Sequence, residues 1–325
     1  MDKPLLTIAI PTYNRASYLE LCLSRIFNQL SKKEPLVEVL ISNNNSSDNT
    51  EEIVNRYVSQ GLTVSYIRNA TNIGADRNLL QCFTRAGGKY VLIMGDDDVL
   101  LEGSIKTILD ILKNDEYGIV HFNSYGFVDD YISERPKGSP SGYAVYDDPA
   151  KFAAKVSYFL TFISSNIINK SLVSVDADLN EFIGTNLVQL GWTFPALISS
   201  KKNVFIKEYL LAAKLYNSGG YKLSDVFAVN INKIFDVFIK KGADPRIFGI
   251  INNKLLSLHF PAQIIRARKN LLDLGKEDYY EALYPLYHNN PFFWLFTVPA
   301  ILLPLGVVSP VFSLAKIMRR YTAFL

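Results

Sequence analysis

The sequence of 325 residues contains only two cysteines, Cys22 and Cys82, and each stands among apolar residues at helical spacing. Two cysteines cannot build the disulfide framework of a small secreted domain. The first residues hold no basic segment followed by a long apolar core and a small-residue cleavage site, so the sequence predicts no secretory signal. We therefore expect both cysteines to be reduced core residues of a protein that works in a reducing compartment.

Excess positive charge is also scarce, because 34 Lys and Arg residues are nearly balanced by 31 Asp and Glu residues, for a formal charge of +3. This balance does not indicate a nucleic-acid partner, and we expect none. Walker loops, dinucleotide glycine fingerprints, zinc-binding helices and nucleophile elbows are all absent from the sequence. The hydrophobic content of 49% is that of a folded chain with one large domain or two smaller ones.

Short apolar runs alternate with helical patterns over the first 125 residues. Strands are predicted at 5–10, 37–41, 63–67, 90–94 and 119–122, and helices at 17–30, from 50 onward, at 76–85 and at 105–112. This rhythm predicts an α/β fold with a mainly parallel sheet and flanking helices. Ligands of such sheets bind beyond the carboxyl ends of the strands, which singles out the loops 11–15, 42–48 and 95–98.

The pattern weakens after about residue 130. Residues 133–148 are rich in Gly, Pro and Ser, which predicts a loop or linker. The apolar stretches at 152–168 and 226–239 predict helices. The C-terminal part of the chain is therefore expected to be mostly helical.

The tail from residue 292 to residue 315 contains no charged residue, opens with four aromatic residues in five positions, and is followed by Lys316, Arg319 and Arg320. It is long enough to span a bilayer, but its three prolines would interrupt a simple spanning helix. The pattern favours an anchor on the membrane surface. A spanning hairpin or helix and a core element are the alternatives.

Three adjacent aspartates, Asp96, Asp97 and Asp98, follow the predicted strand 90–94. Their mutual repulsion would be relieved by a hard divalent cation such as Mn²⁺ or Mg²⁺, which prefers oxygen ligands. Such a cation can bridge a diphosphate and stabilise its charge as it leaves. A solvated acidic turn is the alternative, and the position at the end of a strand favours the metal site.

The residues Pro11, Thr12, Tyr13 and Arg15 close the first predicted strand at the same edge of the sheet. Tyr13 is suited to stack on a base or cover a ribose, and Arg15 is suited to bind phosphate. A polar turn without a ligand is the alternative interpretation of this segment.

Amides and a glycine occupy two further loops. Asn43 and Asn44 close the second strand, where their amide groups can read the edge of a base. Gly74 suits a special backbone angle before the third helix, and Arg77 is placed to approach a diphosphate. A polar turn and an ordinary surface helix start are the alternatives.

The segments 7–15, 39–50, 72–78 and 95–98 together resemble the motifs of family 2 glycosyltransferases of the GT-A type, in the family's order and spacing. The resemblance implies a nucleotide-diphosphate sugar donor and Mn²⁺ or Mg²⁺ held by the acidic motif. It also implies donor contacts from the other singled-out residues, which are Pro11, Thr12, Tyr13, Arg15, Asn43, Asn44, Gly74, Arg77 and Asp96. The size and apolar tail are similar to those of bacterial O-antigen transferases of the abequosyltransferase type.

The sequence departs from the family pattern at Asn43 and Asn44, because the family usually has two aspartates there, one of which contacts the base. A carboxylate accepts from the N3–H of uracil or thymine, whereas an amide can also donate to the N3 acceptor of cytosine. We therefore hypothesise that the donor is a CDP-sugar.

A second departure concerns the general base. Inverting members usually carry an acidic residue, often as Glu-Asp, about a hundred positions beyond the metal motif to deprotonate the acceptor hydroxyl. No Glu-Asp pair stands there, and Glu181, with Asp176 and Asp178 upstream, is the candidate base. A surface carboxylate and a retaining reaction, which needs no such base, are the alternatives.

The sequence thus predicts an enzyme that transfers a sugar from a nucleotide-diphosphate donor onto a lipid-linked saccharide, in the synthesis of O-antigen or another surface polysaccharide. We expect 1–130 to bind the donor, 131–255 to bind the acceptor, and 256–325 to form a helical, apolar tail. This tail would associate with the membrane surface at the cytoplasmic face of the inner membrane, peripherally or as a tail anchor. A sugar-phosphate nucleotidyltransferase and a non-catalytic saccharide-binding scaffold of the same fold are the alternatives.

Overall fold

The computed structural model describes residues 3–30, 34–138, 140–174, 178–216, 220–271 and 277–310. The chain divides into two compact units, one of residues 1–152 and 159–215, and one of residues 153–158 and 216–325. All of the predicted site residues belong to the first unit. The functional roles expected for 1–130, 131–255 and 256–325 stay predictions.

The first unit is built on a single sheet with the strand order β3-β2-β1-β4-β8-β6-β9-β5, and β7 pairs with β9. Its strands are β1 (Leu6–Thr12), β2 (Val37–Asn43), β3 (Val64–Arg68), β4 (Tyr90–Ile93), β5 (Val99–Leu100), β6 (Ile119–Phe127), β7 (Tyr143–Tyr146), β8 (Asn166–Asn169) and β9 (Asn203–Lys214). β1 to β4 run parallel to one another, and β6 runs parallel to β9, whereas β5, β7 and β8 are antiparallel to their neighbours. The predicted α/β fold with a mainly parallel sheet is confirmed.

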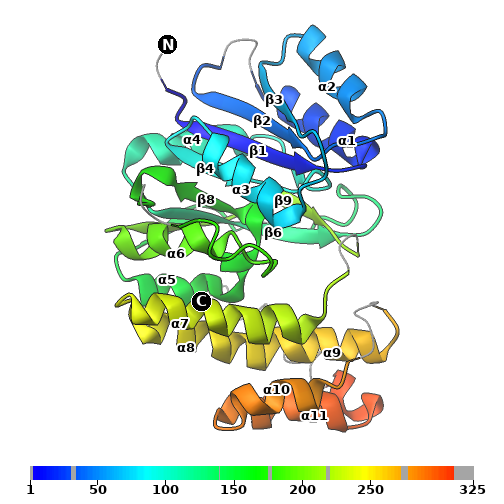
Figure 1. Cartoon of the computed structure of the whole chain (residues 1–325), viewed down its shortest axis with the longest axis vertical. Helices are drawn as coiled ribbons and strands as arrows, with labels where there is room; N and C mark the ends of the chain where they lie inside the picture. Colours follow the sequence, from blue (N-terminus) through cyan, green and yellow to red (C-terminus); the bar gives the residue numbers. More distant parts are fainter. Residues whose placement is uncertain are drawn as a thin grey trace. The chain divides into compact units, whose positions relative to one another are not determined.

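Helices cover both faces of this sheet (Figure 1). The apolar sides of α1 (Ala16–Phe27), α2 (Thr50–Ser59) and α4 (Ser104–Asn114) share one buried cluster with alternate residues of β1 and β2. α3 (Ala75–Arg85) contacts β1, β2 and β4, and its Phe83 stacks on Trp192 of α6 (Leu190–Ser199) at 4.5 Å between ring centroids. This layering leaves the carboxyl ends of β1, β2 and β4 at one edge.

The cysteines and His121 are core residues. Cys22 and Cys82 are both free and buried, as predicted. His121 is buried in β6, and its Nδ1 lies 2.8 Å from Oδ1 of Asn166. Burial lowers the pKa of His121 to about 4, which keeps the ring neutral at physiological pH.

Two predictions beyond residue 130 were wrong in part. The predicted loop 133–148 contains the strand β7, which pairs with residues 203–206 of β9. The predicted helix 152–168 is the shorter α5 (Pro149–Val156), followed by two 3₁₀ turns and the strand β8 between β4 and β6. Both strands depend on partners far along the chain, so local composition does not reveal them.

The second unit is helical, as predicted. It contains α7 (Ile231–Lys240), α8 (Pro245–Lys254), α9 (Phe260–Arg268), α10 (Tyr279–Tyr287) and α11 (Val298–Leu302), with the π-helical segments η4 (Asp225–Asn230), η5 (Leu255–His259) and η6 (Phe293–Thr297). η5 precedes Pro261 and η6 precedes Pro299. A proline lacks the N–H and crowds the carbonyl one turn back, and a wider π turn accommodates this.

The apolar tail therefore does not break at Pro299, because η6 continues directly into α11, which ends before Pro304. No helix within the described residues is long and apolar enough to cross a membrane. Lys316, Arg319 and Arg320 lie outside the described residues.

Candidate active site

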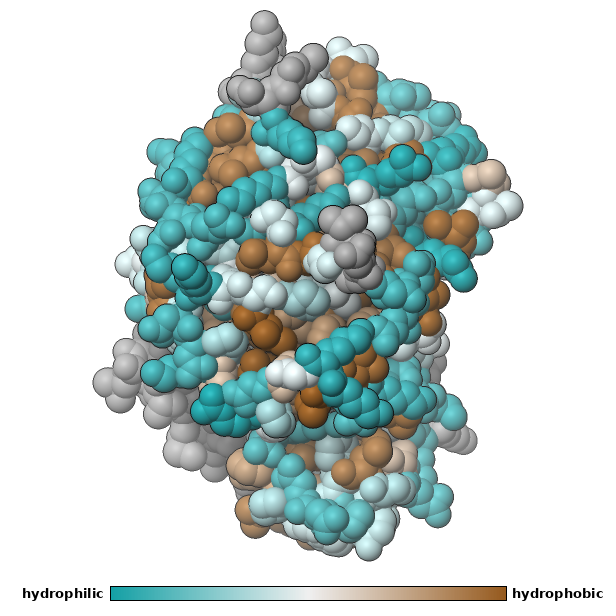
Figure 2. Space-filling view, turned by 60° about the vertical axis from the view of Figure 1, so that its left-hand side comes forward, coloured by the Kyte–Doolittle hydropathy of each residue, from teal (hydrophilic) through white to brown (hydrophobic). Residues whose placement is uncertain are grey.

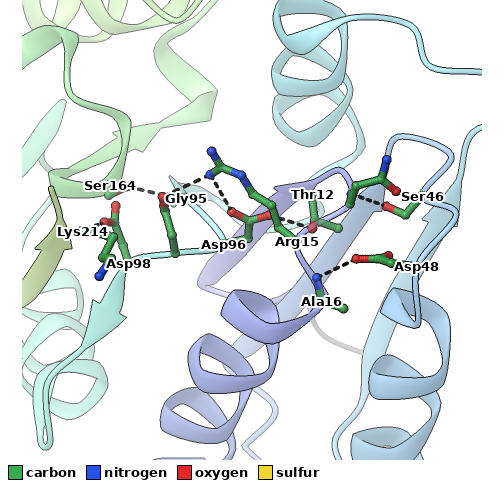
Figure 3. Close-up of polar contacts among 12 residues, drawn as sticks. Thr12, Arg15, Ala16, Ser46, Asp48, Gly95, Asp96, Asp98, Ser164 and Lys214 are labelled. Atoms are coloured by element: carbon green, nitrogen blue, oxygen red, sulfur yellow. Dashed lines mark hydrogen bonds and ion pairs between the residues drawn. The ribbon is translucent and has the colours of Figure 1, made fainter. Parts of the chain in front are cut away.

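The carboxyl ends of β1 and β4 are joined by a hydrogen bond between residues that are far apart in the sequence. The hydroxyl of Thr12 donates to Oδ2 of Asp96 at 2.7 Å. Arg15, just beyond β1, approaches Oδ1 of Asp96 at 3.3 Å and Oδ2 of Asp97 at 3.1 Å (Figure 3). One guanidinium thus bridges two of the three adjacent carboxylates and orders the acidic loop.

Asp98 has different partners from Asp96 and Asp97. Its Oδ1 accepts a 3.0 Å hydrogen bond from the backbone N–H of Lys214, at the end of β9. Its carboxylate also contacts the hydroxyl of Ser164, which accepts a 3.0 Å hydrogen bond from the backbone N–H of Gly95 (Figure 3). Asp98 is thereby fixed from a strand and a turn that follow it by many residues.

Burial makes the charged forms of Asp96 and Asp98 costly, and the contacts that the protein supplies offset this cost only in part. Burial raises the pKa of Asp98 to about 7, and the charge of Asp97 adds to the effect. Burial also raises the pKa of Asp96 to about 6, although the hydrogen bond from Thr12 and the charge of Arg15 lower it. Both carboxylates would be ionised more readily next to a cation.

The oxygen-only donor set and the space beside Gly95 fit a divalent cation. A Cβ atom on Gly95 would lie 2.7 Å from Oδ1 of Asp97 and 3.3 Å from Oδ2 of Asp98, so these two oxygens border one small space. Among the described residues, no group of three or more His, Cys, Asp or Glu side chains converges as a metal site. Mg²⁺ is commonly held by only one or two carboxylates, with phosphates and water completing its shell, and a pair of carboxylates fits that pattern.

The loops after β1 and β2 are held together by Asp48. Its Oδ2 accepts from the backbone N–H of Ala16 at 2.9 Å (Figure 3). Its Oδ1 accepts from the hydroxyl of Thr50 at 2.6 Å. Asn14 takes a left-handed backbone angle (φ 53°), and its N–H donates to the Ser46 hydroxyl at 2.9 Å. One carboxylate therefore serves the first turns of both α1 and α2.

The amides of Asn43 and Asn44 are buried and occupied by protein partners. Asn43 donates to the Tyr66 hydroxyl at 2.8 Å and accepts from the backbone N–H of Ser46 at 2.8 Å. Asn44 donates to Oδ1 of Asn72 at 2.8 Å and accepts from the backbone N–H of Ile73 at 2.9 Å. A base that reads either amide must replace one of these bonds, and the base-reading role stays a prediction.

The other predicted donor contacts take separate positions. Pro11 is the last residue but one of β1, beside Thr12, and Tyr13 is 44% exposed. Gly74 has φ 86°, which confirms its special backbone angle at the start of α3. Arg77 is exposed on α3 and borders a groove that also contains Ile183.

The candidate base, Glu181, lies in an exposed turn of the first unit. The backbone N–H groups of Gly184 and Asn186 in this segment donate to Oδ2 of Asp76 at 2.7 and 3.1 Å, which ties the turn to α3. Of the two aspartates upstream of it, Asp176 lies outside the described residues, and Asp178 is exposed. The catalytic role of Glu181 stays a prediction.

Sequence reasoning missed Ser164, Lys214 and Asp76, all of which order this region. Ser164 and Lys214 reach Asp98 from positions 66 and 116 residues later. Asp76 reaches Gly184 over 108 residues. No local pattern could have indicated these partners, because each depends on how distant strands and turns meet.

Residues 7–164 match the family model described as glycosyl transferase family 2. The chain is 41% identical over 102 residues to the abequosyltransferase RfbV of Salmonella typhimurium, over 31% of this chain and 30% of that protein. It is 32% identical over 107 residues to the GalNAc(5)-diNAcBac-PP-undecaprenol beta-1,3-glucosyltransferase of Campylobacter jejuni, over 33% of this chain and 34% of that protein. The matched segments thus span about a third of the length of each relative.

Among solved structures, residues 1–349 of S. aureus TarS superpose with a TM-score of 0.61 at 17% identity, over 94% of this chain and 83% of that one. The complex of the same protein with UDP also gives a TM-score of 0.61, at 18% identity, over 82% of this chain and 83% of that one. At this level of identity the likeness shows a shared fold.

Proposed function

We propose that this chain is an enzyme that transfers a sugar from a nucleotide-diphosphate donor, because residues 7–164 match the model of glycosyl transferase family 2. The observation that carries the proposal is the acidic loop after β4, where Asp96 and Asp98 are buried and Asp96 is held by Thr12 and Arg15 from the end of β1. Buried carboxylates whose charge is not neutralised are costly unless a cation or substrate uses them. The loop also lies at the edge of the sheet where α/β proteins bind ligands.

A divalent cation bound here would supply positive charge that stabilises the departing nucleoside diphosphate. Asp97 and Asp98 would hold it, since their oxygens border the space beside Gly95. Thr12 and Arg15 would hold the Asp96 carboxylate in a fixed orientation toward the donor. Arg15 would also balance the negative charge that the acidic loop keeps between turnovers.

The nucleotide of the donor is proposed on two grounds. TarS, which shares the fold, was solved with UDP and with UDP-GlcNAc, which supports a nucleotide sugar for this fold. The amides Asn43 and Asn44 favour CDP, as argued above, once the base replaces one of their internal hydrogen bonds. Competition among CDP, UDP and dTDP tests this choice, and it would be abandoned if CDP were the weakest ligand.

The acceptor is proposed to be a lipid-linked saccharide. The Campylobacter relative is named for a saccharide attached to undecaprenol through a diphosphate. Apolar residues of the tail are exposed in this chain, with Trp294 44%, Leu295 67% and Leu302 64% exposed. Figure 2 also shows hydrophobic residues on the surface at the height at which Figure 1 draws α10 and α11.

Such an apolar surface suits peripheral binding to a membrane and would keep the enzyme near its acceptor. We propose that the enzyme works at the cytoplasmic face of the inner membrane in the synthesis of O-antigen or another surface polysaccharide. Glu181 is the proposed base of an inverting reaction, and a retaining reaction without that base is the alternative.

The proposal is tested by incubating the purified protein and Mn²⁺ with CDP-, UDP-, GDP- and dTDP-sugars and a bacterial lipid extract, and measuring the nucleoside diphosphate released. Release from one donor, dependent on both the extract and Mn²⁺, is expected. The Asp98→Asn variant should lose it, and the Asp110→Asn variant, altered on the exposed side of α4, should keep it. Equal release by the Asp98→Asn variant would refute the role of the acidic loop.

A further inference from the structure

A groove of about 540 Å³ lies beside α3, on a part of the first unit that the acidic loop does not line. One wall is the exposed side of α3, and the other is the turn that follows residue 178. Its lining residues are Ile73, Arg77, Leu80, Gln81, Thr84, Arg85, Leu179, Asn180 and Ile183.

The buried carboxylate of Asp76 builds this groove. It accepts from the backbone N–H groups of Gly184 and Asn186, and both of these residues take left-handed backbone angles, with φ of 88° and 57°. A turn with two such angles needs a partner that stabilises it, and Asp76 provides one from the first turn of α3. The second wall of the groove is therefore fixed to the first.

The charge of the groove is of one sign. Arg77 and Arg85 are the charged residues of its lining, and no carboxylate is among them. Within the described residues, neither arginine forms an ion pair. Both guanidinium groups are consequently available to an anionic ligand.

The apolar part of the lining is aliphatic. Ile73, Leu80, Leu179 and Ile183 line it, and no aromatic ring does. Arg77 and Arg85 stand eight residues apart on the same helix, so their Cα atoms are about 12 Å apart along its axis. A lining that combines aliphatic side chains with two guanidinium groups suits a ligand that combines a hydrocarbon chain with phosphate.

We propose that this groove binds an isoprenoid diphosphate, which is the lipid part of the acceptor. The inference rests on the proposed function, because a lipid-linked acceptor carries such a group. The diphosphate lies against Arg77 or Arg85, and the isoprenoid chain covers Leu80 and Ile183. The groove thus holds the lipid end of the acceptor apart from the acidic loop that serves the donor.

The test measures binding of farnesyl diphosphate to the full chain by calorimetry, without donor or turnover. Arg77→Ala and Arg85→Ala should each weaken binding about tenfold, as expected for loss of a charge-assisted hydrogen bond. Leu80→Gln replaces an aliphatic side chain with a polar one that also favours a helix. It should weaken the binding of farnesyl diphosphate and leave the weak binding of inorganic pyrophosphate unchanged. Asp76→Ala should weaken binding, and Asp76→Asn, which keeps the accepting oxygen, should restore most of it.

Arg135→Ala is the matched control, because Arg135 is exposed in the segment before β7 and does not line the groove. Equal affinity of the wild type and the Arg77→Ala and Arg85→Ala variants would overturn the proposal. Binding only to vesicles of anionic phospholipid, and not to farnesyl diphosphate, would overturn it as well. Nucleotide binding, measured in parallel on Arg85→Ala and Leu80→Gln, which alter no predicted donor contact, should be unchanged, so failure of the donor site and failure of the groove are told apart.

Discussion

The hydroxyl of Thr12 donates a 2.7 Å hydrogen bond to the carboxylate of Asp96, although 84 residues separate them in the chain. Both groups are buried, and they join the carboxyl ends of the neighbouring strands β1 and β4. The acidic loop is therefore attached to the same edge of the sheet that carries Arg15. This bond places the charge of the candidate metal site beside the residues that would bind the donor.

Replacing Thr12 with valine, which keeps the shape of the side chain, should remove this bond and leave Asp96 with less support. We expect the free energy of unfolding at pH 8 to fall by about 1–3 kcal/mol, as for a lost bond to a buried charged group. Urea denaturation measures it. Thr12→Ser keeps the hydroxyl and should retain most of the stability, so equal losses in the two variants would show that the bond is unimportant.

The pH dependence of stability should report Asp98. Its pKa in the fold is about 7, above the ordinary value of 3.8, so the folded protein holds this proton more tightly than the unfolded chain. The associated stability is full below about pH 4 and is lost as the pH rises through 7. Without metal, we expect a loss of about 2–3 kcal/mol between pH 5 and pH 8 that Asp98→Asn removes.

Chemical denaturation in the presence of a chelator measures this loss. The quantity compared is the free energy of unfolding of the wild type and of Asp98→Asn at each pH. Adding Mn²⁺ at pH 8 should restore stability to the wild type alone, because a ligand of the folded state stabilises it. Parallel pH profiles of the two proteins would contradict the assignment of the buried charge to Asp98.

The two neighbouring amides should respond differently to a carboxylate. Asn44→Asp would place a negative charge beside two acceptors, Oδ1 of Asn72 and the carbonyl of Gly74. We expect a loss of about 2–4 kcal/mol in the free energy of unfolding. Asn43→Asp should be milder, since the Tyr66 hydroxyl can turn to donate to the carboxylate. Thermal unfolding of both variants measures this, and similar losses would contradict the proposed hydrogen-bond directions.

The exposed apolar residues of the tail should determine binding to membranes. Leu295→Ser and Leu302→Ser together should weaken binding to lipid vesicles by about a hundredfold, at about 1.5 kcal/mol for each leucine removed from the lipid. Cosedimentation with vesicles measures this. Leu271→Ser, at a leucine that is also exposed in the second unit, is the control and should bind as the wild type does. Unchanged binding of the double variant would assign the membrane contact elsewhere.

The part of the fold that could be predicted from the sequence is the part whose signals are local. The strands β1 to β4 are apolar runs that end in polar turns, and the helices between them show apolar residues at helical spacing. β5 has two residues, and β7 lies in a segment rich in Gly, Pro and Ser. Both exist because β9 offers them a partner more than fifty residues away, and no local pattern shows that.

The candidate site divides in the same way. The three aspartates could be found because they are adjacent and follow an apolar strand. The partners of Asp98 could not be found from the sequence, because Ser164 and Lys214 lie near Asp98 only in the folded first unit. Asn44 shows a third case: its place in the chain indicates a base contact, whereas its packing gives it protein partners.

The most direct test of the central claim is calorimetric titration of CDP, UDP, GDP and dTDP into the wild type, Asp97→Ala and Asp98→Asn, with and without Mn²⁺. Asp110→Asn is the control for the loss of an exposed carboxylate. We predict that one nucleotide binds the wild type and the control only with Mn²⁺, and that both variants of the acidic loop lose this binding while staying folded. Two results would contradict a metal-assisted nucleotide-sugar site at Asp96 to Asp98. One is that the folded wild type binds no nucleotide, and the other is that binding is equally strong without Mn²⁺ and in both variants.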